Sequence, residues 1–453
     1  MLQHNPLFEK QEQQVFSKSF SSLKLNQLLR NAGINKSYGI SAAVVFQIIF
    51  NLVFLGQNWF RLLNSKCKED LPGKDTVYRF LNHHRYAWRK FLHSLSLCIL
   101  ERFEKLTSDS RTNVFIIDDS ILQRNRSKKS ELLARVHDHA SNRFVKGYTM
   151  LTLGWSDGYS FLPIDFTMLS SANDNNRISE MKKDLDKRTH GYKRRIESLL
   201  KKPDAVVKML VNAINAGFSA DYVLMDSWFT HAPLLRALTD KKLNVIGMVK
   251  DLKQRYSYDG HKLSLKEIYT TIPKNPKAEI LGSVVVETPC GLPLKIVFVK
   301  NRNNKREWLA ILSTDLSLDN SEIVRIYGMR WSIETFFKFS KSYLKLGTEF
   351  QGRSFDMLIG HTTIVFARYL ILEWERRHNS DDRSLGGLFY LFCDEVRDID
   401  LKTALQNLMV FVFDILNRVS NMERTLLFCQ LQQWISSFPS HIKALFANLG
   451  CES

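Results

Sequence analysis

Cysteine is scarce in this chain, and its spacing matches neither a disulfide framework nor a zinc module. The six cysteines are scattered over the sequence: Cys67, Cys98, Cys290, Cys393, Cys429 and Cys451. No two of them stand at the short spacing that metal-binding pairs use. The pattern is typical of a protein in a reducing compartment, so we expect a cytoplasmic location.

Long hydrophobic runs and nucleotide-binding loops are also missing. The most apolar stretch, Ile40 to Leu55, is interrupted by Gln47 and Asn51, so we expect no membrane span. The N-terminus lacks the basic, apolar and small-residue order of a secretory signal. Gly73-Lys74 lacks the upstream glycine and the following hydroxyl residue of a phosphate-binding loop, which argues against ATP-driven chemistry.

Acidic residues are the minority charge. The 453 residues include 64 Lys and Arg against 46 Asp and Glu, which gives a net charge of +18 and a pI near 9.5. Such a balance on a large chain predicts affinity for a polyanion such as nucleic acid, although a merely basic soluble protein remains an alternative. Hydrophobic residues make up 44%, enough for well-buried cores in two or three domains.

The N-terminal region, residues 1–105, has helical periodicity and is the expected DNA-binding region. Residues 71–81 within it predict a turn followed by a short helix. Lys74, Thr76 and Arg79 of that helix can reach a DNA groove, as in a helix-turn-helix. An ordinary helical hairpin has the same pattern, so both interpretations stay open.

The middle of the chain changes to an alternation of strands and helices. Apolar β-type runs lie at residues 114–117, 148–155, 161–166, 222–225 and 245–249. The alternation predicts an α/β sheet domain over residues 110–375. Residues 251–318 alternate as half-buried strands and predict a β-rich insertion. Residues 376–453 are expected to form a helical C-terminal region that is a candidate for dimerisation.

One short segment carries the clearest functional pattern. Tyr327 is followed by Arg330, Glu334 and Lys341 at offsets of 3, 7 and 14 residues. On a single helix these four side chains fall within roughly 60° of one another. An adjoining apolar stripe is formed by Ile326, Ile333, Phe337 and Leu344. The helix therefore buries one face and presents a carboxylate between cations, although an amphipathic helix with a surface ion pair has the same pattern.

Two further carboxylates follow apolar strands. Asp118 and Asp226 each come directly after a β-type run, where catalytic groups of α/β sheets gather. With Glu334 they predict a set of three oxygen ligands for two Mg²⁺ ions. Either aspartate can instead be a turn or cap residue, and the adjacent Asp119 is an alternative ligand.

These segments resemble those of bacterial insertion-sequence transposases of the Asp-Asp-Glu (DDE) type. Tyr327, Arg330, Glu334 and Lys341 match the Y-(2)-R-(3)-E-(6)-K signature of the insertion-sequence-four group at every position. Asp118-Asp119-Ser120 resembles the D-x-T/S of its first strand, with Ser for the commoner Thr, and Asp226-Ser227-Trp228-Phe229 resembles its second acidic segment. The D-x-S pattern favours Asp118 over Asp119.

The resemblance covers about residues 110–375 and implies an RNase H-like core with a β-rich insertion before Glu334. It implies DNA cleavage at the terminal inverted repeats and strand transfer into target DNA, with Mg²⁺ as cofactor and Mn²⁺ as a substitute. It further implies a hairpin intermediate, a homodimer on two synapsed ends, and a bacterial cytoplasmic location at the nucleoid.

Side chains around the carboxylates have two interpretations each. Arg330 and Lys341 can grip DNA phosphates or pair with Glu334. Tyr327 can hydrogen-bond a phosphate or pack in the core. In the family that the chain resembles, a tryptophan of the insertion stacks on a flipped base; Trp308 is the candidate, and a core-facing strand residue is the alternative.

Two other polar segments are less specific. His137-Asp138-His139 resembles a metal cluster but is expected to be a loop, with Lys146 a nearby candidate phosphate contact. The basic run over residues 177–202 is either a solvated helix or part of the DNA track.

The sequence therefore predicts a cut-and-paste transposase in which Asp118, Asp226 and Glu334 hold Mg²⁺. An RNase H-like nuclease that cleaves without joining is the nearest alternative. A captured DNA-binding protein without catalytic activity is the alternative from another class.

Overall fold

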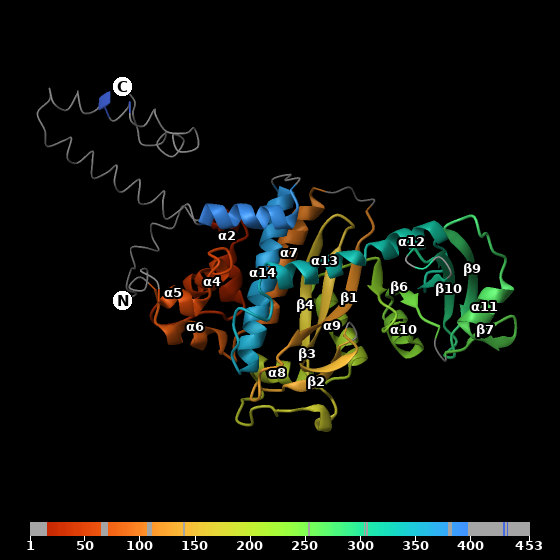
Figure 1. The fold of residues 1–453 in the computed structure, drawn as a ribbon, viewed down its shortest axis with the longest axis horizontal. Coiled ribbons are helices and arrows are strands. Elements are labelled where there is room, and N and C mark those ends of the chain that lie inside the picture. Colours follow the sequence, from red (N-terminus) through yellow and green to blue (C-terminus); the bar gives the residue numbers. More distant parts are fainter. Residues whose placement is uncertain are drawn as a thin grey trace, which may run out of the picture.

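The computed structural model describes most of the chain between residues 16 and 396. The described residues are 16–64, 71–106, 111–138, 141–251, 254–302, 304, 307–378, 383–396, 429, 430 and 433. The expected helix at residues 404–416, and most of the expected C-terminal region 376–453, lie outside them. Figure 1 shows the ribbon, with the predicted β-rich insertion at the right-hand end.

Helices lie at both ends of the described chain and between the strands. Before the first strand they are α2 (Ser17–Ser22), α3 (Leu25–Asn31), α4 (Ala42–Asn51), α5 (Trp59–Leu63), α6 (Lys74–Leu81) and α7 (Trp88–Glu104). Those that follow are α8 (His190–Glu197), α9 (Lys202–Ala216), α10 (Ala232–Thr239), α11 (Leu265–Thr271), α12 (Asn320–Gly328), α13 (Trp331–Ser342) and α14 (Phe355–His378). The helical pattern predicted for residues 1–105 is confirmed in the part that the structure describes, residues 16–64 and 71–105.

The strands join into a single mixed sheet. They are β1 (Val114–Gln123), β2 (Ala134–Asp138), β3 (Arg143–Ser156), β4 (Phe161–Leu169), β5 (Tyr222–Met225), β6 (Asn244–Val249), β7 (Tyr256–Tyr258), β8 (His261–Leu263), β9 (Ile280–Glu287), β10 (Pro293–Lys300) and β11 (Trp308–Ser313). Each run that was predicted as β-type lies in a strand, because its β-branched and aromatic residues bury well on a pleated surface.

The central strands have the order β4-β3-β1-β5-β6. Strand β3 is antiparallel to β1 and β4, and the turn between β3 and β4 contains Gly158 at φ +85°. Strands β1, β5 and β6 are parallel, with helical crossovers between them. Three antiparallel strands followed by two parallel ones form an RNase H-like sheet, so the expected α/β fold class is confirmed.

The β-rich insertion continues this sheet. Strand β11 pairs antiparallel with β6, and β10, β9, β7 and β8 follow outward in turn. Helix α12 leads from the insertion back to the core and packs against β6, β9, β10 and β11. The insertion therefore delivers the chain from the sheet edge to the helix that carries Glu334 (Figure 1).

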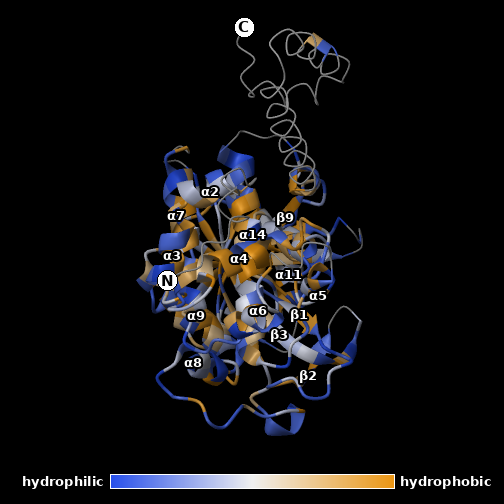
Figure 2. Cartoon of the chain, turned by 90° about the vertical axis from the view of Figure 1, so that its left-hand side faces the viewer, coloured by the Kyte–Doolittle hydropathy of each residue, from blue (hydrophilic) through white to orange (hydrophobic). Residues whose placement is uncertain are grey.

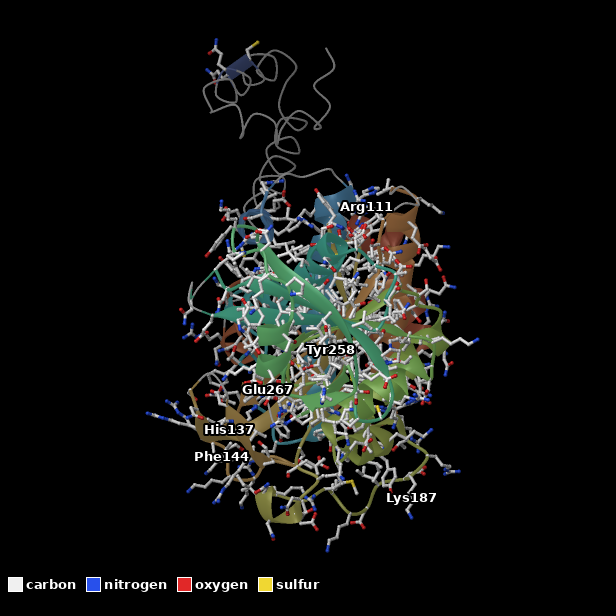
Figure 3. All side chains as sticks on the ribbon, turned by 90° about the vertical axis from the view of Figure 1, so that its right-hand side faces the viewer. Arg111, His137, Phe144, Lys187, Tyr258 and Glu267 are labelled. Atoms are coloured by element: carbon white, nitrogen blue, oxygen red, sulfur yellow. The ribbon has the colours of Figure 1, made fainter. Side chains whose placement is uncertain are left out.

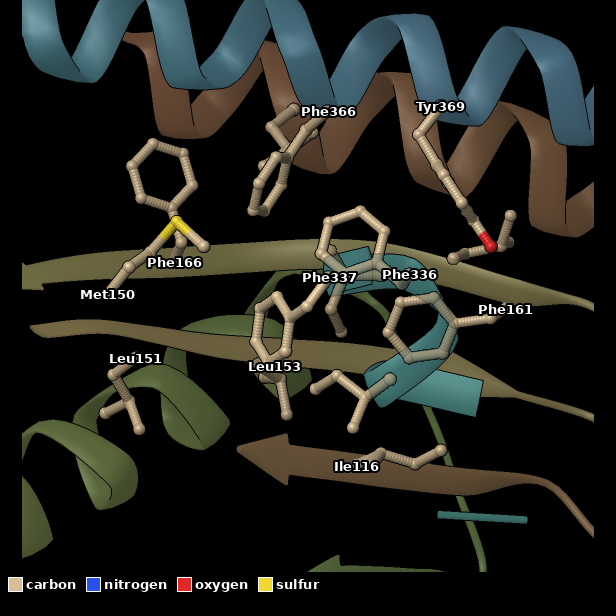
Figure 4. Close-up of a cluster of buried hydrophobic side chains, with 14 of the residues drawn as sticks. Ile116, Met150, Leu151, Leu153, Phe161, Phe166, Phe336, Phe337, Phe366 and Tyr369 are labelled. Atoms are coloured by element: carbon tan, nitrogen blue, oxygen red, sulfur yellow. The ribbon is translucent and has the colours of Figure 1, made fainter. Parts of the chain in front are cut away.

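The central sheet is covered on both faces. In Figure 4, Phe336 and Phe366 pack between the strands and α14, whereas Leu151 points to the opposite side, toward a helix below the sheet. Phe336 and Phe366 make an edge contact, with ring centroids 5.0 Å apart. All nine residues of β4 are buried, as expected for a strand enclosed on both sides.

The N-terminal helices share a hydrophobic core with α14. Helices α4, α6 and α7 all contact α14, and Arg368 of α14 donates to the carbonyl oxygen of Phe50 at 3.0 Å. In Figure 2 the ribbon is coloured hydrophobic mainly in the interior and hydrophilic mainly at the outside. By length and composition α14 is apolar enough to cross a membrane, but its apolar window is completely buried inside the protein. That position is the one a core helix takes.

Three local predictions differ from the structure. The single helix expected through Tyr327 and Lys341 is two helices, because α12 ends at Gly328 and α13 begins at Trp331. Strand β1 does not end before Asp118 but continues to Gln123, because β3 pairs with it along its whole length. The polar helix expected over residues 177–202 begins only at His190, and the residues before it are mostly irregular.

Candidate active site

The sheet brings Asp118 and Asp226 to the same level on adjacent strands. Ile117 of β1 is paired with Met225 of β5, and each aspartate is the next residue in its chain. Neighbouring strands lie about 4.8 Å apart, so the two carboxylates are neighbours at the carboxyl end of β5, which is called the catalytic edge below. The Asp226 carboxylate accepts a hydrogen bond from the backbone N–H of Trp228 at 2.9 Å, which holds the loop after β5.

The turn between α12 and α13 aims Arg330 at these carboxylates. Met329 and Arg330 keep right-handed helical angles, but their N–H groups donate to the residues three positions earlier, at 3.0 Å each. Such bonds tighten the helix locally. The apolar stripe on the same helices is buried as predicted; Ile333 is fully buried and Phe337 is 8% exposed. Burying the stripe directs the polar side toward Asp118 and Ser120 of β1.

Arg330 joins two of the three carboxylates. Its guanidinium donates to Asp118 at 2.9 Å and forms an ion pair with Glu334. The side chain of Arg330 is only 15% exposed, and that of Asp118 is 17% exposed. The pKa of Asp118 is raised to about 7, because burial outweighs the opposing effect of Arg330 and the nearby Asp226 adds to the rise. The site is therefore a desolvated acidic cluster with one internal cation.

Asp119 faces the opposite side of the sheet. Successive residues of a strand point to opposite faces, and Asp119 forms an ion pair with Lys202 at the start of α9. The ammonium of Lys202 also lies 3.9 Å from the ring centroid of Trp228. Asp119 therefore has a partner of its own and does not approach Arg330, which favours Asp118 as the carboxylate of the site.

The other two signature residues lie beside the cluster. Lys341 donates to the hydroxyl of Ser120 at 2.5 Å, and burial lowers the pKa of Lys341. Tyr327 is largely buried, and burial raises its pKa to about 12. The guanidinium carbon of Arg330 lies 5.9 Å from the Tyr327 ring centroid. All four signature side chains are therefore at the edge that carries Asp118, two of them bonded directly to β1.

The donor set suits a hard divalent cation. Aspartate and glutamate oxygens are the ligands that Mg²⁺ and Mn²⁺ prefer. The burial and mutual repulsion that raise the pKa of Asp118 are the costs that an added cation relieves. In the present arrangement, the described residues contain no group of three His, Cys, Asp or Glu side chains placed to hold a metal ion. Asp118 and Glu334 are instead bonded to Arg330.

Trp308 packs among aromatic rings of the insertion, and its contact with DNA stays a prediction. Trp308 begins β11, and its ring stacks on Tyr269 with centroids 4.8 Å apart and meets the edge of Phe298 at 5.1 Å. By contrast, Trp228 is 43% exposed and Trp331 is 64% exposed, both close in sequence to the carboxylates. Sequence reasoning missed these two; their positions two residues after Asp226 and three before Glu334 were the available signal.

The candidate DNA-contact residues of α6 are on a solvent-facing side. Lys74 and Arg79 are exposed and Thr76 is half-buried, while Val77 and Phe80 are buried. The helix itself is confirmed, and its contact with DNA stays a prediction.

The structure also describes most of the two less specific segments, residues 137–139 and 177–202. His137 and Asp138 lie on β2 rather than in a loop, and His139 is outside the described residues. Figure 3 places His137 beside Phe144 at one margin of the molecule. Within residues 177–202, Arg194 and Arg195 are buried, so this run is not a uniformly solvated face.

Comparison with known families identifies the same part of the chain. Residues 68–261 match the family described as "DDE superfamily endonuclease", and residues 201–371 match "Transposase DDE domain". Asp118 lies in the first range, Glu334 in the second and Asp226 in both. Both matches support a transposase of the DDE type.

Comparison with curated proteins gives no match. Among solved structures, the chain is similar to one titled "Drosophila P element transposase strand transfer complex", at 10% identity and a TM-score of 0.21. That similarity covers 85% of this chain and 92% of the other.

Proposed function

We propose that the chain is a cut-and-paste transposase of the insertion-sequence-four group. It cleaves a phosphodiester at each end of its element and joins the freed 3′-hydroxyl to target DNA. The observation that carries the proposal is the arrangement of Asp118, Asp226, Arg330 and Glu334 at one edge of an RNase H-like sheet. The family matches over residues 68–371 support it independently.

In this proposal Asp118, Asp226 and Glu334 hold Mg²⁺, or Mn²⁺ in its place. The metal supplies Lewis-acid activation of a water or 3′-hydroxyl and stabilises the leaving oxygen. Arg330 and Lys341 bind the phosphates beside the scissile bond, because both are cations at this edge. Tyr327 lies against Arg330 and holds the orientation of its guanidinium.

The partner is DNA, first the terminal inverted repeats and then the target. A homodimer that synapses two ends suits a reaction in which both ends are joined to one target. The net charge of +18 supports strong, salt-dependent contact with phosphates.

A strand-transfer assay with precut element ends tests the proposal. With Mg²⁺ and a supercoiled target, the full chain is expected to join the ends, whereas Glu334→Gln binds the ends without joining them. Metal-dependent nicking without any joining supports the alternative of an RNase H-like nuclease. DNA binding without nicking supports the non-catalytic alternative.

A further inference from the structure

A basic groove opens at the end of β1, beyond the candidate active site. Two segments line its volume of about 680 Å³: residues 123–130, which follow β1, and residues of 347–353, which join α13 to α14. Four of the lining side chains are exposed cations, and no carboxylate is among the lining residues: Arg126, Lys128, Lys129 and Arg353. None of the four forms an ion pair with any carboxylate in the part of the chain that the structure describes.

The two walls of the groove are fastened to each other. Arg124 donates to the carbonyl oxygens of Gly347 and Phe350, the latter at 3.3 Å. The backbone N–H of Glu131 donates to the carbonyl oxygen of Arg353 at 2.9 Å. Because these contacts use backbone groups and Arg124, they leave the four cations facing outward.

Glu131, which follows the basic segment in the chain, is turned away from these cations. Its side chain turns inward and forms an ion pair with Arg195 at 2.5 Å. It also accepts the backbone N–H of Phe355 at 3.1 Å, at the start of α14. The positive charge of the groove is therefore not neutralised from within.

The groove is continuous with the catalytic edge. Gln123 at its rim is the last residue of β1, the strand that carries Asp118. Five residues of strand span about 17 Å, which corresponds to about five base pairs of B-form DNA. On the far side, Phe350 contacts Tyr78 of α6, with ring centroids 6.2 Å apart.

We propose that this groove, formed by residues 123–130 and 347–353, binds the sugar-phosphate backbone of the DNA duplex between the scissile phosphate and α6. The inference rests on the proposed function, because it names where the substrate of that site lies. The contacts are charge contacts to phosphates without base recognition, since the four cations lie on loops and no helix or strand projects from the groove. Binding here fixes the register of the duplex at the active site.

The test measures DNA binding without catalysis. The triple variant Arg126→Gln/Lys128→Gln/Lys129→Gln and the single variant Arg353→Gln, on the opposite wall, are compared with the unchanged chain. Fluorescence anisotropy with an end-bearing duplex in EDTA gives Kd over a range of salt concentrations. The triple variant is expected to bind roughly tenfold or more weakly, and its slope of log K against log salt falls by about 2–3.

A matched control removes three lysines from the opposite end of the sheet. Lys105 follows α7, and Lys241 and Lys242 precede β6, so Lys105→Gln/Lys241→Gln/Lys242→Gln changes the same charge away from the groove. Figure 3 shows how far apart these two ends are. Arg111, just before β1, marks the end near Lys105, and it lies across the molecule from His137 of β2. The control variant is expected to lose less than half as much slope as the triple variant.

A length series locates the contact. In this series the duplex is shortened from one end toward the scissile phosphate. Once fewer than about five base pairs remain on that side, the unchanged chain and the triple variant should have the same Kd. If the Kd and salt slope of the triple variant equal those of the control variant, the proposal that this groove binds DNA is wrong. If the unchanged chain never nicks DNA but the groove variants still bind weakly, the groove stands and the transposase proposal fails. If the triple variant does not fold, the Kd and salt slope of Arg353→Gln are compared with those of the unchanged chain instead.

Discussion

Arg330 donates to Asp118 at 2.9 Å across 212 positions of sequence, and the same guanidinium contacts Glu334. One partly buried arginine therefore joins two carboxylates that are candidate metal ligands. In the described arrangement it provides the positive charge that the acidic cluster requires. This relationship makes the response of the protein to metal ions predictable.

Removing Arg330 should make stability depend more strongly on metal. In Arg330→Gln, Asp118, Asp226 and Glu334 lose their internal cation, so without metal the variant is expected to unfold at a lower temperature. Added Mg²⁺ should restore about 1–3 kcal/mol through binding to the folded state, a larger gain than in the unchanged chain. Thermal unfolding with EDTA or Mg²⁺ measures the difference.

Arg325→Gln is the control for that measurement. Arg325 lies on α12, where it pairs with Glu322 and donates to the hydroxyl of Thr112 rather than to the carboxylates of the site. Its Mg²⁺ response should equal that of the unchanged chain. Equal Mg²⁺ responses in all three proteins would mean that Arg330 does not compete with a metal.

Substituting Trp331 should affect DNA binding or processing, whereas substituting Trp308 should affect stability. Trp331 is exposed and lies three residues before Glu334 in the chain. If it stacks on a base, Trp331→Ala should weaken DNA binding or a step after the first nick by about 1–3 kcal/mol, with little change in Tm. Trp308 is stacked on Tyr269, so Trp308→Ala should cost about 2–3 kcal/mol of stability. Anisotropy and thermal unfolding distinguish them.

The sequence-based expectation for Trp308 predicts a different result. If Trp308→Ala is stable and nicks normally but fails at a later step, then Trp308 does act on an extruded base. A stable Trp331→Ala with unchanged binding and unchanged kinetics would remove the role assigned to Trp331.

Acid should destabilise the protein through a buried histidine. His361 on α14 is 2% exposed and hydrogen-bonds Glu349 at 2.8 Å, while Arg368 pairs with the same carboxylate. Burial lowers the pKa of His361 below its usual value near 6.5, so the folded state keeps it neutral while the unfolded chain takes up a proton. Stability from this group is complete above pH 6.5 and is lost as the pH falls below it.

Urea unfolding at pH 7.5 and pH 5.5 tests that sign. The free energy of unfolding should fall at pH 5.5, and His361→Gln should show a smaller fall because no imidazole is left to titrate. A variant that loses as much stability as the unchanged chain would assign the acid sensitivity to other groups.

The strands and most helices were predictable because burial leaves a periodic pattern in the sequence. The run of residues 114–117 became β1, but the extension to Gln123 depended on pairing with β3, which no local pattern encodes. The break between α12 and α13 also escaped prediction, because its only sequence signal is Gly328, which helices often tolerate, and Met329 and Arg330 keep nearly helical angles.

The site was less predictable than the fold. Residue spacing placed Arg330 near Glu334, which is four positions away, but no spacing could assign Asp118 as its second partner. That contact is made by the parallel sheet and the α12–α13 turn together. The basic groove was missed because Arg126, Lys128 and Lys129 lie in a loop without periodicity, and Arg353 joins them only in the folded chain.

The most direct test compares Asp118→Asn with Asp119→Asn in a nicking assay on end-bearing DNA with Mg²⁺. Both substitutions remove one charge from adjacent residues of one strand, but only Asp118 faces Arg330 and Asp226. We expect Asp118→Asn to lower the nicking rate by roughly 10³-fold, or about 4 kcal/mol, with end binding retained. Asp119→Asn should keep most of the activity. Normal nicking by Asp118→Asn would contradict the assignment of the site.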